Sequence, residues 1–506
     1  MLNRRHALQA LAALGGAGLT AQAAARPAAA AEFAAAVARQ PLLTPFKGVT
    51  DTTGERFTER LATRGRWPAA LAGRFYRNGP ALYERNGERY HHWFDGDGMV
   101  QQFTLAAGRI SHRGRLVRTA KLESEARAGR FLMNAFGTSI EGGPPGTGPD
   151  SFNTANTNAL EHAGRVLAMW EGGSAYGLDP KDLSTQGPVV WRDDLRQVPF
   201  SAHPKLDPRG HLWNIGTSGN RIVAWHIDPQ GALAGVQVGE LPSADGMVHD
   251  MAVTERYLVV PLPPVQLNFN APVGQGGDGP RRFALQAGQP LRVLVMAKAD
   301  ISKRRVFELP PQVVFHVGNA HETADGQVVL SYVGAPDAWF LDVGAVALMK
   351  GQIAAGGASS THVARLDMSN GRASTQSLDD TVEFPRIDPR RIGLPARWLL
   401  SAASWTEAHR KGNSLLHGLQ LRDTQGGGVR RFDYGAHTIV EEHILVPKPG
   451  QRGELDAWLL GTTFDARSQS TVLNLLDAAR IEDGPIAQAT LPYVLPLGFH
   501  GNFTGA

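Results

Sequence analysis

From about residue 67 onward, short apolar segments alternate with turns, and this alternation limits the possible folds more than any other feature. The segments are rich in β-branched, aliphatic and aromatic residues, and Gly, Pro, Asp or Asn residues separate them. No run of amphipathic helices interrupts the pattern, so we expect an all-β fold. The expected strands cover residues 73–77, 91–105, 165–170, 212–215, 257–262, 291–297, 328–333, 361–366, 457–463 and 471–476.

Several of the segments lead into a turn that carries an aspartate. GLDPKDL (177–183), LDPRGHLW (206–213), RLDMSNGR (365–372) and NLLDAARIEDG (474–484) share this arrangement. Its repetition is typical of a β-propeller, whose blades repeat a hairpin around an axis. The repeat is too degenerate to count blades, and an array of β-sandwiches remains the alternative.

No linker divides the chain, so we expect one propeller domain over residues 32–506. The Gly- and Pro-rich loops 142–151 and 274–280 and the apolar stretch 339–349 are interpreted as insertions in it. Residues 34–43 are interpreted as a short helix or a linker, because Pro41 and Pro45 oppose a long helix.

The first residues have the pattern of an export signal. Arg4 and Arg5 precede an apolar run at 7–19, and Ala21 and Ala23 supply a cleavage site of the A-x-A type. We interpret residues 1–31 as a twin-arginine signal peptide and linker and expect export to the periplasm by that route. A frayed, alanine-rich helix is the alternative, and no other segment is apolar enough to span a bilayer.

Composition excludes several classes of function. The 51 basic and 47 acidic residues give a formal charge of +4 without a long basic run, so nucleic acid is not an expected partner. The chain has no cysteine, which excludes disulfides, thiolate zinc sites, iron–sulfur clusters and cysteine nucleophiles. Any metal must therefore be bound by nitrogen or oxygen.

Four histidines lie beside short apolar segments that are far apart in the sequence. They are His203 in FSAHPKLD, His249 in GMVHDMAV, His316 in VVFHVGNAHE and His500 in PLGFHGNF. One such histidine alone is more often a core residue than a ligand. In a closed ring of blades, however, four of them can converge near the axis. Four neutral imidazoles suit Fe, Cu, Ni or Zn rather than Mg or Ca, so we predict a metal site of that kind.

Three glutamates also lie in apolar, strand-like segments. Glu171 lies in LAMWEGG, Glu383 in TVEFPRID and Glu442 in EEHILVP. A metal-bound imidazole usually donates its second N–H group to an acceptor such as a carboxylate, which fixes the tautomer and the ring angle. We therefore predict that these glutamates orient the histidines.

The chain resembles the carotenoid cleavage oxygenases over nearly its whole length after the signal. The motifs that carry the resemblance occur in the family's order: FYRNGP, HHWFDGDGMV, RLVRT, NTN, MWEGG, AHPKLDP, MVHDMAVT, FHVGNAHE, EFPRID, ILVP and LPLGFHG. The resemblance implies a seven-bladed propeller whose loops cap an axial, non-haem Fe(II) ion, one per chain, with O2 as co-substrate.

The resemblance also assigns the site residues. It implies that His203, His249, His316 and His500 bind the iron, and that Glu171, Glu383 and Glu442 pair with the last three of these histidines. His321 and Glu322, in the same motif as His316, are not expected to be ligands.

The implied reaction is oxidative cleavage of a C=C bond to two carbonyl products, and two branches of the family compete for the substrate. Stilbene-cleaving members commonly have a lysine before the glutamate matched to Glu171, and a tyrosine in the segment matched to His112. Here Trp170 replaces the lysine, which favours a carotenoid or apocarotenoid. A lignostilbene-type dioxygenase and a non-catalytic, propeller-shaped binding protein are the alternatives.

The expected partner is a hydrophobic polyene or stilbene. A membrane surface at the mouth of the substrate tunnel is a further candidate partner. No acid or base residue is expected beyond the metal centre. The candidates for the wall and mouth of a substrate tunnel are Trp170, Phe315, Trp339 and Phe340.

Overall fold

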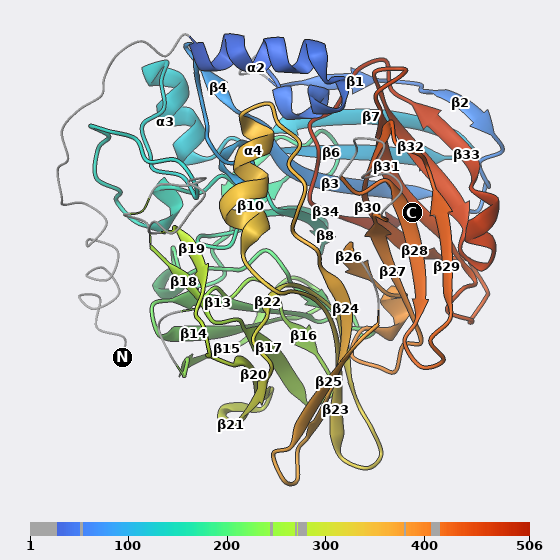
Figure 1. Cartoon of the computed structure of the whole chain (residues 1–506). Helices are drawn as coiled ribbons and strands as arrows, with labels where there is room; N and C mark the ends of the chain where they lie inside the picture. The colour runs from blue at the N-terminus through green and yellow to red at the C-terminus, as the bar shows by residue number, and fades with distance from the viewer. Residues whose placement is uncertain are drawn as a thin grey trace.

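Seven antiparallel sheets of four or five strands make up most of the part of the chain that the structure describes (Figure 1). This structure is a computed structural model, and it describes residues 28–50, 54–242, 246–268, 271, 281–378, 381–405 and 415–506. The sheets are the blades of a seven-bladed β-propeller. The expected all-β class and propeller are thereby confirmed, and the array of β-sandwiches is excluded.

The strands of each blade are ordered from its outer edge to the propeller axis. Blade 1 contains β1 (Arg56–Thr58), β7 (Arg109–Leu116), β6 (Asp97–Ala106), β3 (Gly73–Leu82) and β34 (His500–Gly505). Blade 2 contains β11 (Thr185–Pro188), β10 (Tyr176–Leu178), β9 (Arg165–Met169) and β8 (Asn158–His162). Blade 3 contains β15 (Leu233–Glu240), β14 (Arg221–Ile227), β13 (Leu212–Ser218) and β12 (Lys205–Leu206). Blade 4 contains β21 (Asp300–Leu309), β20 (Leu291–Ala297), β17 (Tyr257–Leu262) and β16 (Ala252–Val253).

The remaining blades follow the same scheme. Blade 5 contains β25 (Ala373–Ser377), β24 (Ser360–Asp367), β23 (Gln327–Ala335) and β22 (Val313–Glu322). Blade 6 contains β29 (Val429–Asp433), β28 (Gly418–Asp423), β27 (Trp398–Ala403) and β26 (Val382–Arg386). Blade 7 contains β2 (Ala62–Gly65), β33 (Pro485–Thr490), β32 (Ser470–Asp477), β31 (Ala457–Asp465) and β30 (Thr438–Pro447). Two small hairpins accompany the blades, β4 (Glu84–Arg85) with β5 (Glu88–Arg89) and β18 (Val265–Leu267) with β19 (Phe283–Leu285).

Strands from the beginning and the end of the chain pair with each other and close the ring. The last strand, β34, pairs with β3 and becomes the innermost strand of blade 1, with His500 opposite Asn78. The early strand β2 pairs with β33 at the outer edge of blade 7. Since β34 contacts the innermost strands of the two neighbouring blades, β8 and β30, closure places His500 at the axis.

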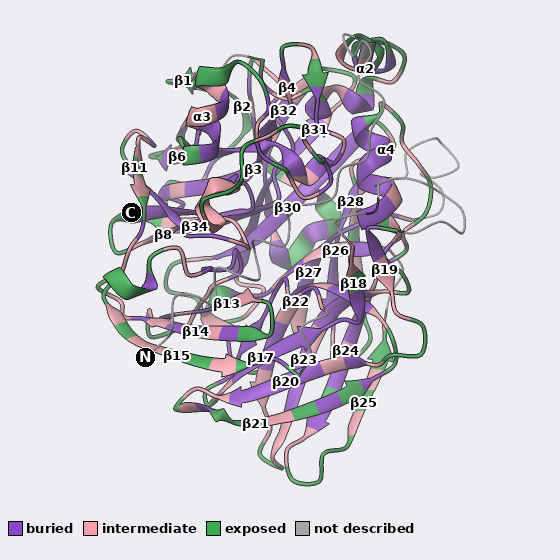
Figure 2. Ribbon diagram, turned by 90° about the vertical axis from the view of Figure 1, so that its left-hand side faces the viewer, coloured by how far each residue is buried: buried purple, intermediate pink, exposed green. Residues whose placement is uncertain are grey.

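Apolar side chains on both faces of a blade pack against its neighbours. In β20, Val293 and Val295 pack toward blade 5, whereas Leu294 and Met296 pack toward blade 3. Both faces are buried, which explains the continuous apolar run that predicted this strand. Each such side chain contributes roughly 1.5–3 kcal/mol of transfer free energy. Figure 2 shows that exposed residues concentrate on outer strands such as β21 and β25, whereas β20 and β23 are largely buried.

Short helices lie at the ends of strands and over one side of the propeller (Figure 1). Within the described ranges, the α-helices are α2 (Ala28–Arg39), α3 (Ala120–Ala128) and α4 (Ala345–Met349), and η5 (Phe340–Gly344) is a π-helix that leads into α4. The 3-10 helices are η1 (Pro41–Lys47), η2 (Trp93–Asp95), η3 (Pro149–Ser151), η4 (Asp193–Leu195), η6 (Pro389–Arg391) and η7 (Ala478–Asp483). Among the described residues, no helix has the length and apolar composition needed to cross a membrane.

Two sequence expectations need correction or limitation, and one helix was not expected. The strand expected at 91–105 is wrong in its first part, because His92 caps the helix η2 and the strand begins only at Asp97. The helix α3 was not expected; the Thr119 side chain caps its start and Gly129 ends it in the left-handed conformation. The signal peptide expected at 1–31 lies outside the described residues up to residue 27, and residues 28–31 belong to α2.

Candidate metal centre

The four predicted histidines meet at the propeller axis. His203 lies two residues before the inner strand β12, and His249 lies three residues before β16. His316 lies within β22, and His500 begins β34. Each residue is about 5% exposed. The Nε2 atom of His249 lies 3.0 Å from that of His203 and 3.3 Å from that of His316, and the Nε2 atoms of His316 and His500 are 3.0 Å apart. All four ligand atoms lie within 4.8 Å of one another.

These spacings fit a bound metal ion. Two imidazole nitrogens bound at right angles to one ion, at about 2.1 Å each, would be about 3.0 Å apart. Three of the rings point their Nδ1 atoms at carboxylates, so the proton of a neutral ring belongs on Nδ1 and the Nε2 lone pairs face one another. Lone pairs that face one another repel, and a cation bound between the four Nε2 atoms removes this repulsion. A donor set made of nitrogen atoms alone suits a transition metal.

Each predicted glutamate lies behind one of the three histidines, His249, His316 and His500, that the resemblance paired with the glutamates as a set. His316 Nδ1 lies 2.5 Å from Glu383 Oε2, and His500 Nδ1 lies 2.8 Å from Glu442 Oε1. Glu171 forms a close ion-pair contact with His249 Nδ1, although the two groups are not aligned as a hydrogen bond. His203 differs, because its nearest carboxylate oxygen is Asp250 Oδ1, 3.8 Å from Nδ1.

Every blade contributes one of these seven residues. The four histidines come from blades 1, 3, 4 and 5, and the three glutamates come from blades 2, 6 and 7. The centre therefore depends on the complete ring, and no single blade or hairpin contains it.

β-bulges turn the site residues toward the axis. The pairing of β22 with β23 shifts between Val314 and Val317, around His316. The pairing of β26 with β27 shifts after Glu383, and that of β30 with β31 shifts across Glu441 and Glu442. A bulge bends its strand and re-aims a side chain, which explains why residues of regular-looking strands reach one point.

Phe384 shows that the backbone next to the centre is strained. Its φ of 57° is uncommon for a residue with a bulky side chain. Its N–H group donates to Glu383 Oε2 at 2.6 Å, and its ring stacks on that of His316 with centroids 5.5 Å apart. The strained conformation therefore holds Glu383 and His316 together.

Charges around the cluster set its protonation. Burial and the neighbouring imidazoles lower the pKa of His203, and burial lowers that of His500 to about 4, so both rings are neutral at neutral pH. Burial alone would lower the pKa of His316, yet the negative charge and hydrogen bond of Glu383 outweigh burial, and the pKa is raised. His316 is therefore the most basic of these three rings. Burial alone would raise the pKa of Glu442, yet the charges of Arg386 and His500 lower it to about 2.

Sequence reasoning did not identify two groups that support the site, Arg386 and Glu441. Arg386 donates from Nε and Nη2 to the two oxygens of Glu442, at 2.8 and 2.9 Å. Glu441 is buried and accepts hydrogen bonds from Arg77, from Thr462 Oγ1 at 2.6 Å and from Gly498 N at 2.6 Å. It thereby fixes the segment before His500. The only sequence signals were the positions of Arg77 and Arg386 in FYRNGP and EFPRID and of Glu441 beside Glu442.

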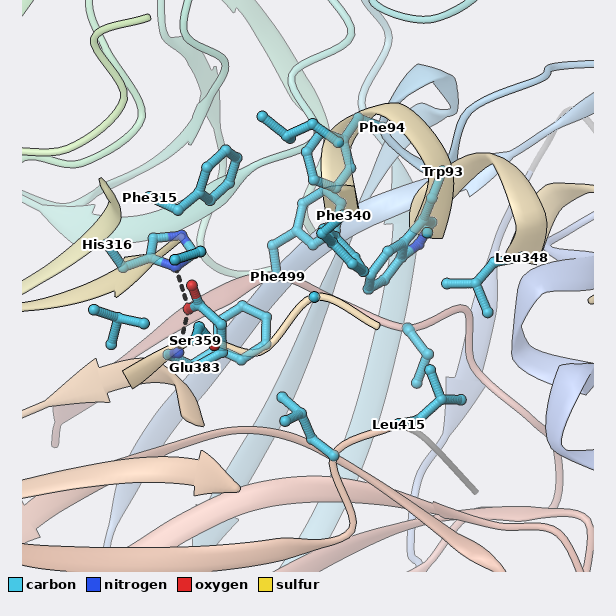
Figure 3. Close-up of a pocket in the computed structure, with 18 of the residues that line it drawn as sticks. Trp93, Phe94, Phe315, His316, Phe340, Leu348, Ser359, Glu383, Leu415 and Phe499 are labelled. Carbon is cyan, nitrogen blue, oxygen red and sulfur yellow. Dashed lines mark hydrogen bonds and ion pairs between the residues drawn. The ribbon is translucent and has the colours of Figure 1, made fainter. Parts of the chain in front are cut away.

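An apolar cavity opens on one side of the histidines, and all four tunnel candidates, Trp170, Phe315, Trp339 and Phe340, line it. The ring of Phe315 stacks on that of His249 with centroids 3.9 Å apart, and Phe94 lies 5.9 Å from Phe315 and 6.3 Å from Phe340. Phe340 is 38% exposed. An aromatic passage thus connects the cluster with the surface. Figure 3 labels the rings of Phe94, Phe315 and Phe340 in it, together with Trp93, Phe499 and the contact between His316 and Glu383.

The structure corrects the comparison made at His112. This residue lies within β7, where Nδ1 is 2.8 Å from Tyr493 Oη and Nε2 is 3.0 Å from Gln101 Oε1, and it does not line the cavity. His112 is therefore not placed to contact a substrate in this cavity. Trp170 does line the cavity and keeps its relevance.

The residues expected not to be ligands lie apart from the cluster. Glu322 accepts hydrogen bonds from Thr254 Oγ1 at 2.7 Å and from Arg256 N at 2.9 Å, and His321 pairs with Val329 within the sheet.

Comparison with known proteins agrees with this geometry. Residues 49–505 match the family described as Retinal pigment epithelial membrane protein. The chain is 30% identical over 471 residues to the apocarotenoid-15,15'-oxygenase of Synechocystis sp., covering 87% of this chain and 91% of that protein. It is 28% identical over 478 residues to lignostilbene-alpha,beta-dioxygenase isozyme III of Sphingomonas paucimobilis, covering 88% and 94%. The crystal structure of the cobalt-substituted Synechocystis apocarotenoid oxygenase superposes with a TM-score of 0.79 at 26% identity, covering 92% of this chain and 99% of that one.

A seven-bladed propeller with four histidines on its axis and a match over most of its length define the class of protein. The chain belongs to the carotenoid cleavage oxygenase family. It is an oxidoreductase of the dioxygenase type.

Proposed function

We propose that the chain is a non-haem, Fe(II)-dependent dioxygenase that cleaves one C=C bond of a carotenoid or apocarotenoid into two carbonyl products, with one iron ion per chain. One observation carries this proposal: the four Nε2 atoms converge at the inner end of an aromatic passage that begins with Phe315. A long, flat polyene matches such a passage in shape and polarity.

The chain's own residues bind, orient and exclude water. His203, His249, His316 and His500 would hold the iron, which, when bound, supplies the redox chemistry between dioxygen and the alkene. Glu171, Glu383 and Glu442 would fix the rings behind the metal. Phe315 and Phe94 align the alkene beside the cluster, and the apolar wall keeps water away. No side chain needs to act as an acid or a base.

Trp170 favours the polyene over the stilbene. It lies on the cavity wall immediately before Glu171, where stilbene-cleaving relatives commonly have a lysine that grips a phenol. An indole offers no cationic partner for a phenolate and leaves the wall apolar. Lignostilbene cleavage is the second candidate, because the Sphingomonas relative is nearly as similar as the Synechocystis one. A non-catalytic binding protein would have no need of all seven histidine and glutamate residues.

The exposed Phe340 marks the outer end of the passage. We place substrate entry there, and a hydrophobic substrate would reach it most directly from a membrane surface. No nucleic-acid partner is proposed.

A paired assay tests the function. Protein purified without oxygen is expected to contain about one iron per chain and, with O2, to bleach an apocarotenal while leaving a hydroxystilbene unchanged. The variant Trp170→Lys is expected to gain stilbene cleavage and lose activity on the apocarotenal. Cleavage of only the stilbene by the wild type would select the second candidate, and a folded wild type that binds no iron would overturn the proposal.

A further inference from the structure

The carboxylate of Asp250 joins three of the four chain segments that carry the histidines. It follows His249 in blade 4 and is 3% exposed. We propose that Asp250 is a positioning residue that fixes the spacing of His203, His249 and His316. This inference rests on the metal site of the proposed function and adds a fourth carboxylate to the three glutamates.

The two oxygens of Asp250 have partners in different blades. Oδ1 accepts a hydrogen bond from Lys205 Nζ at 2.8 Å, and Lys205 stands two residues after His203 in blade 3. Oδ1 also accepts the N–H of Met251 at 2.6 Å, which fixes the side chain on its own strand. Oδ2 accepts the N–H of Val317 at 2.8 Å, and Val317 follows His316 in blade 5.

The contact with Val317 explains how the bulge of β22 is stabilised. The shift in pairing between Val314 and Val317 disturbs the regular ladder around this N–H group, which is buried. A buried N–H without an acceptor costs about 1–3 kcal/mol. Asp250 supplies the acceptor, so the same carboxylate supports the backbone conformation that turns His316 toward the axis.

Asp250 lies behind the histidines, not among the metal-binding nitrogens. Its Oδ1 atom is 3.8 Å from Nδ1 of His203, the ring nitrogen that faces away from the other three imidazoles. It therefore occupies for His203 the side that a glutamate occupies for each of the other histidines. His500, in blade 1, is held independently by Glu442 and by the pairing of β34 with β3.

Cobalt titration of the metal-free protein tests this role. We expect Asp250→Ala to weaken Co(II) binding roughly 100-fold and to change the visible spectrum of the bound Co(II), because the three rings are no longer held at fixed spacing. Asp250→Asn keeps one acceptor oxygen and is expected to lose about 10-fold. Lys205→Met removes only the link to the strand of His203 and is also expected to lose about 10-fold.

The control is Asp367→Ala. Asp367 likewise accepts backbone N–H groups, from Ser369 at 2.8 Å and from Asn370 at 3.3 Å, but in an exposed turn of blade 5. Its Co(II) affinity and spectrum are expected to equal those of the wild type. Should Asp250→Ala fail to fold, Asp250→Asn and Lys205→Met carry the test.

The outcomes separate this inference from the proposed function. Wild-type affinity and spectrum in the Asp250 and Lys205 variants would overturn the inference and leave the metal site intact. A loss of thermal stability without a change in Co(II) affinity or spectrum would show a merely structural role and would also overturn it. A wild type that binds no Co(II) or Fe(II) would overturn both proposals.

Discussion

At the scale of single residues, the histidines of the cluster are not equivalent, because each is held from behind by a different group. His316 and His500 are hydrogen-bonded to glutamates, His249 has an ion-pair contact with Glu171, and His203 has only the more distant Asp250. Loss of any ring removes a quarter of the donor set, whereas loss of a carboxylate leaves the donors in place but poorly aimed. Substitution of a histidine should therefore weaken metal binding more than substitution of a carboxylate behind it.

The variant His249→Ala is expected to lose the metal. Metal content should fall well below one ion per chain, because the ion loses one of its four nitrogen donors while the other three rings stay aimed by their carboxylates at a four-donor site. Elemental analysis of protein purified without oxygen measures this. His321→Ala is the matched control, since His321 lies in a neighbouring inner strand outside the cluster, and full metal content in His249→Ala would contradict the site.

Glu442 gives a prediction for the pH dependence of stability. Its folded-state pKa of about 2 lies below the ordinary value of 4.5, so the carboxylate stabilises the fold fully above pH 4.5. This contribution, on the order of 3 kcal/mol at most, disappears as the pH falls from 4.5 toward 2. In metal-free protein, the difference in unfolding free energy between wild type and Glu442→Gln should therefore be largest near pH 7 and shrink below pH 4.5.

Urea titrations at several pH values measure that difference. Glu240→Gln serves as the control, because the ion pair of Glu240 with Arg221 is about half exposed and surface pairs contribute little. A gap between wild type and Glu442→Gln that stays constant from pH 7 to pH 3 would contradict the prediction.

At the scale of elements, the bulges of β22, β26 and β30 connect fold and site. Each of these inner strands departs from regular pairing where it carries His316, Glu383 or Glu442. A bulge also demands space on the partner strand. Gly461, on β31 opposite the bulge of β30, supplies it: a Cβ atom there would overlap the ring of His443 and lie 2.7 Å from the carbonyl oxygen of Glu442.

The variant Gly461→Ala is accordingly expected to disturb the centre through the backbone. Overpacking of this kind costs about 1–3 kcal/mol, and here it should also displace Glu442 and weaken metal binding. Thermal unfolding and metal titration measure the two effects. Gly505→Ala, where an added Cβ meets open space, should change neither, and unaltered metal affinity in Gly461→Ala would show that the bulge tolerates the methyl group.

The same elements show what the sequence could predict. Apolar runs such as that of β20 predicted strands because both faces of a blade are buried. The seven site residues were predictable because their residue types in apolar segments carry a chemical meaning. The bulges, the positive φ of Phe384 and the links made by Asp250 and Arg386 were not, since they arise from pairing between segments distant in the sequence. For the same reason the sequence could not show that His112, compared there with a tyrosine of stilbene-cleaving relatives, pairs with Tyr493 outside the cavity.

At the scale of the whole molecule, the centre exists only after the last strand has closed the ring. His500 begins β34, which pairs with the early strand β3, so metal binding by all four histidines follows folding of the entire chain. Export of the unfolded chain would separate folding from the metal supply of the cytoplasm. A route for folded proteins would keep folding and metal binding in one compartment.

We therefore propose that residues 1–31 direct export by the twin-arginine route, and we predict that Arg4→Lys combined with Arg5→Lys retains the protein in the cytoplasm. In a bacterial host with this route, cell fractionation should find the wild type in the periplasm, and mass spectrometry should find that it begins after Ala23. Arg39→Lys, at the end of α2, is the matched control and should be exported normally. Export of the double variant at the wild-type level would refute the twin-arginine assignment. Equal iron content in the periplasmic wild type and in the cytoplasmic double variant would support iron binding before export.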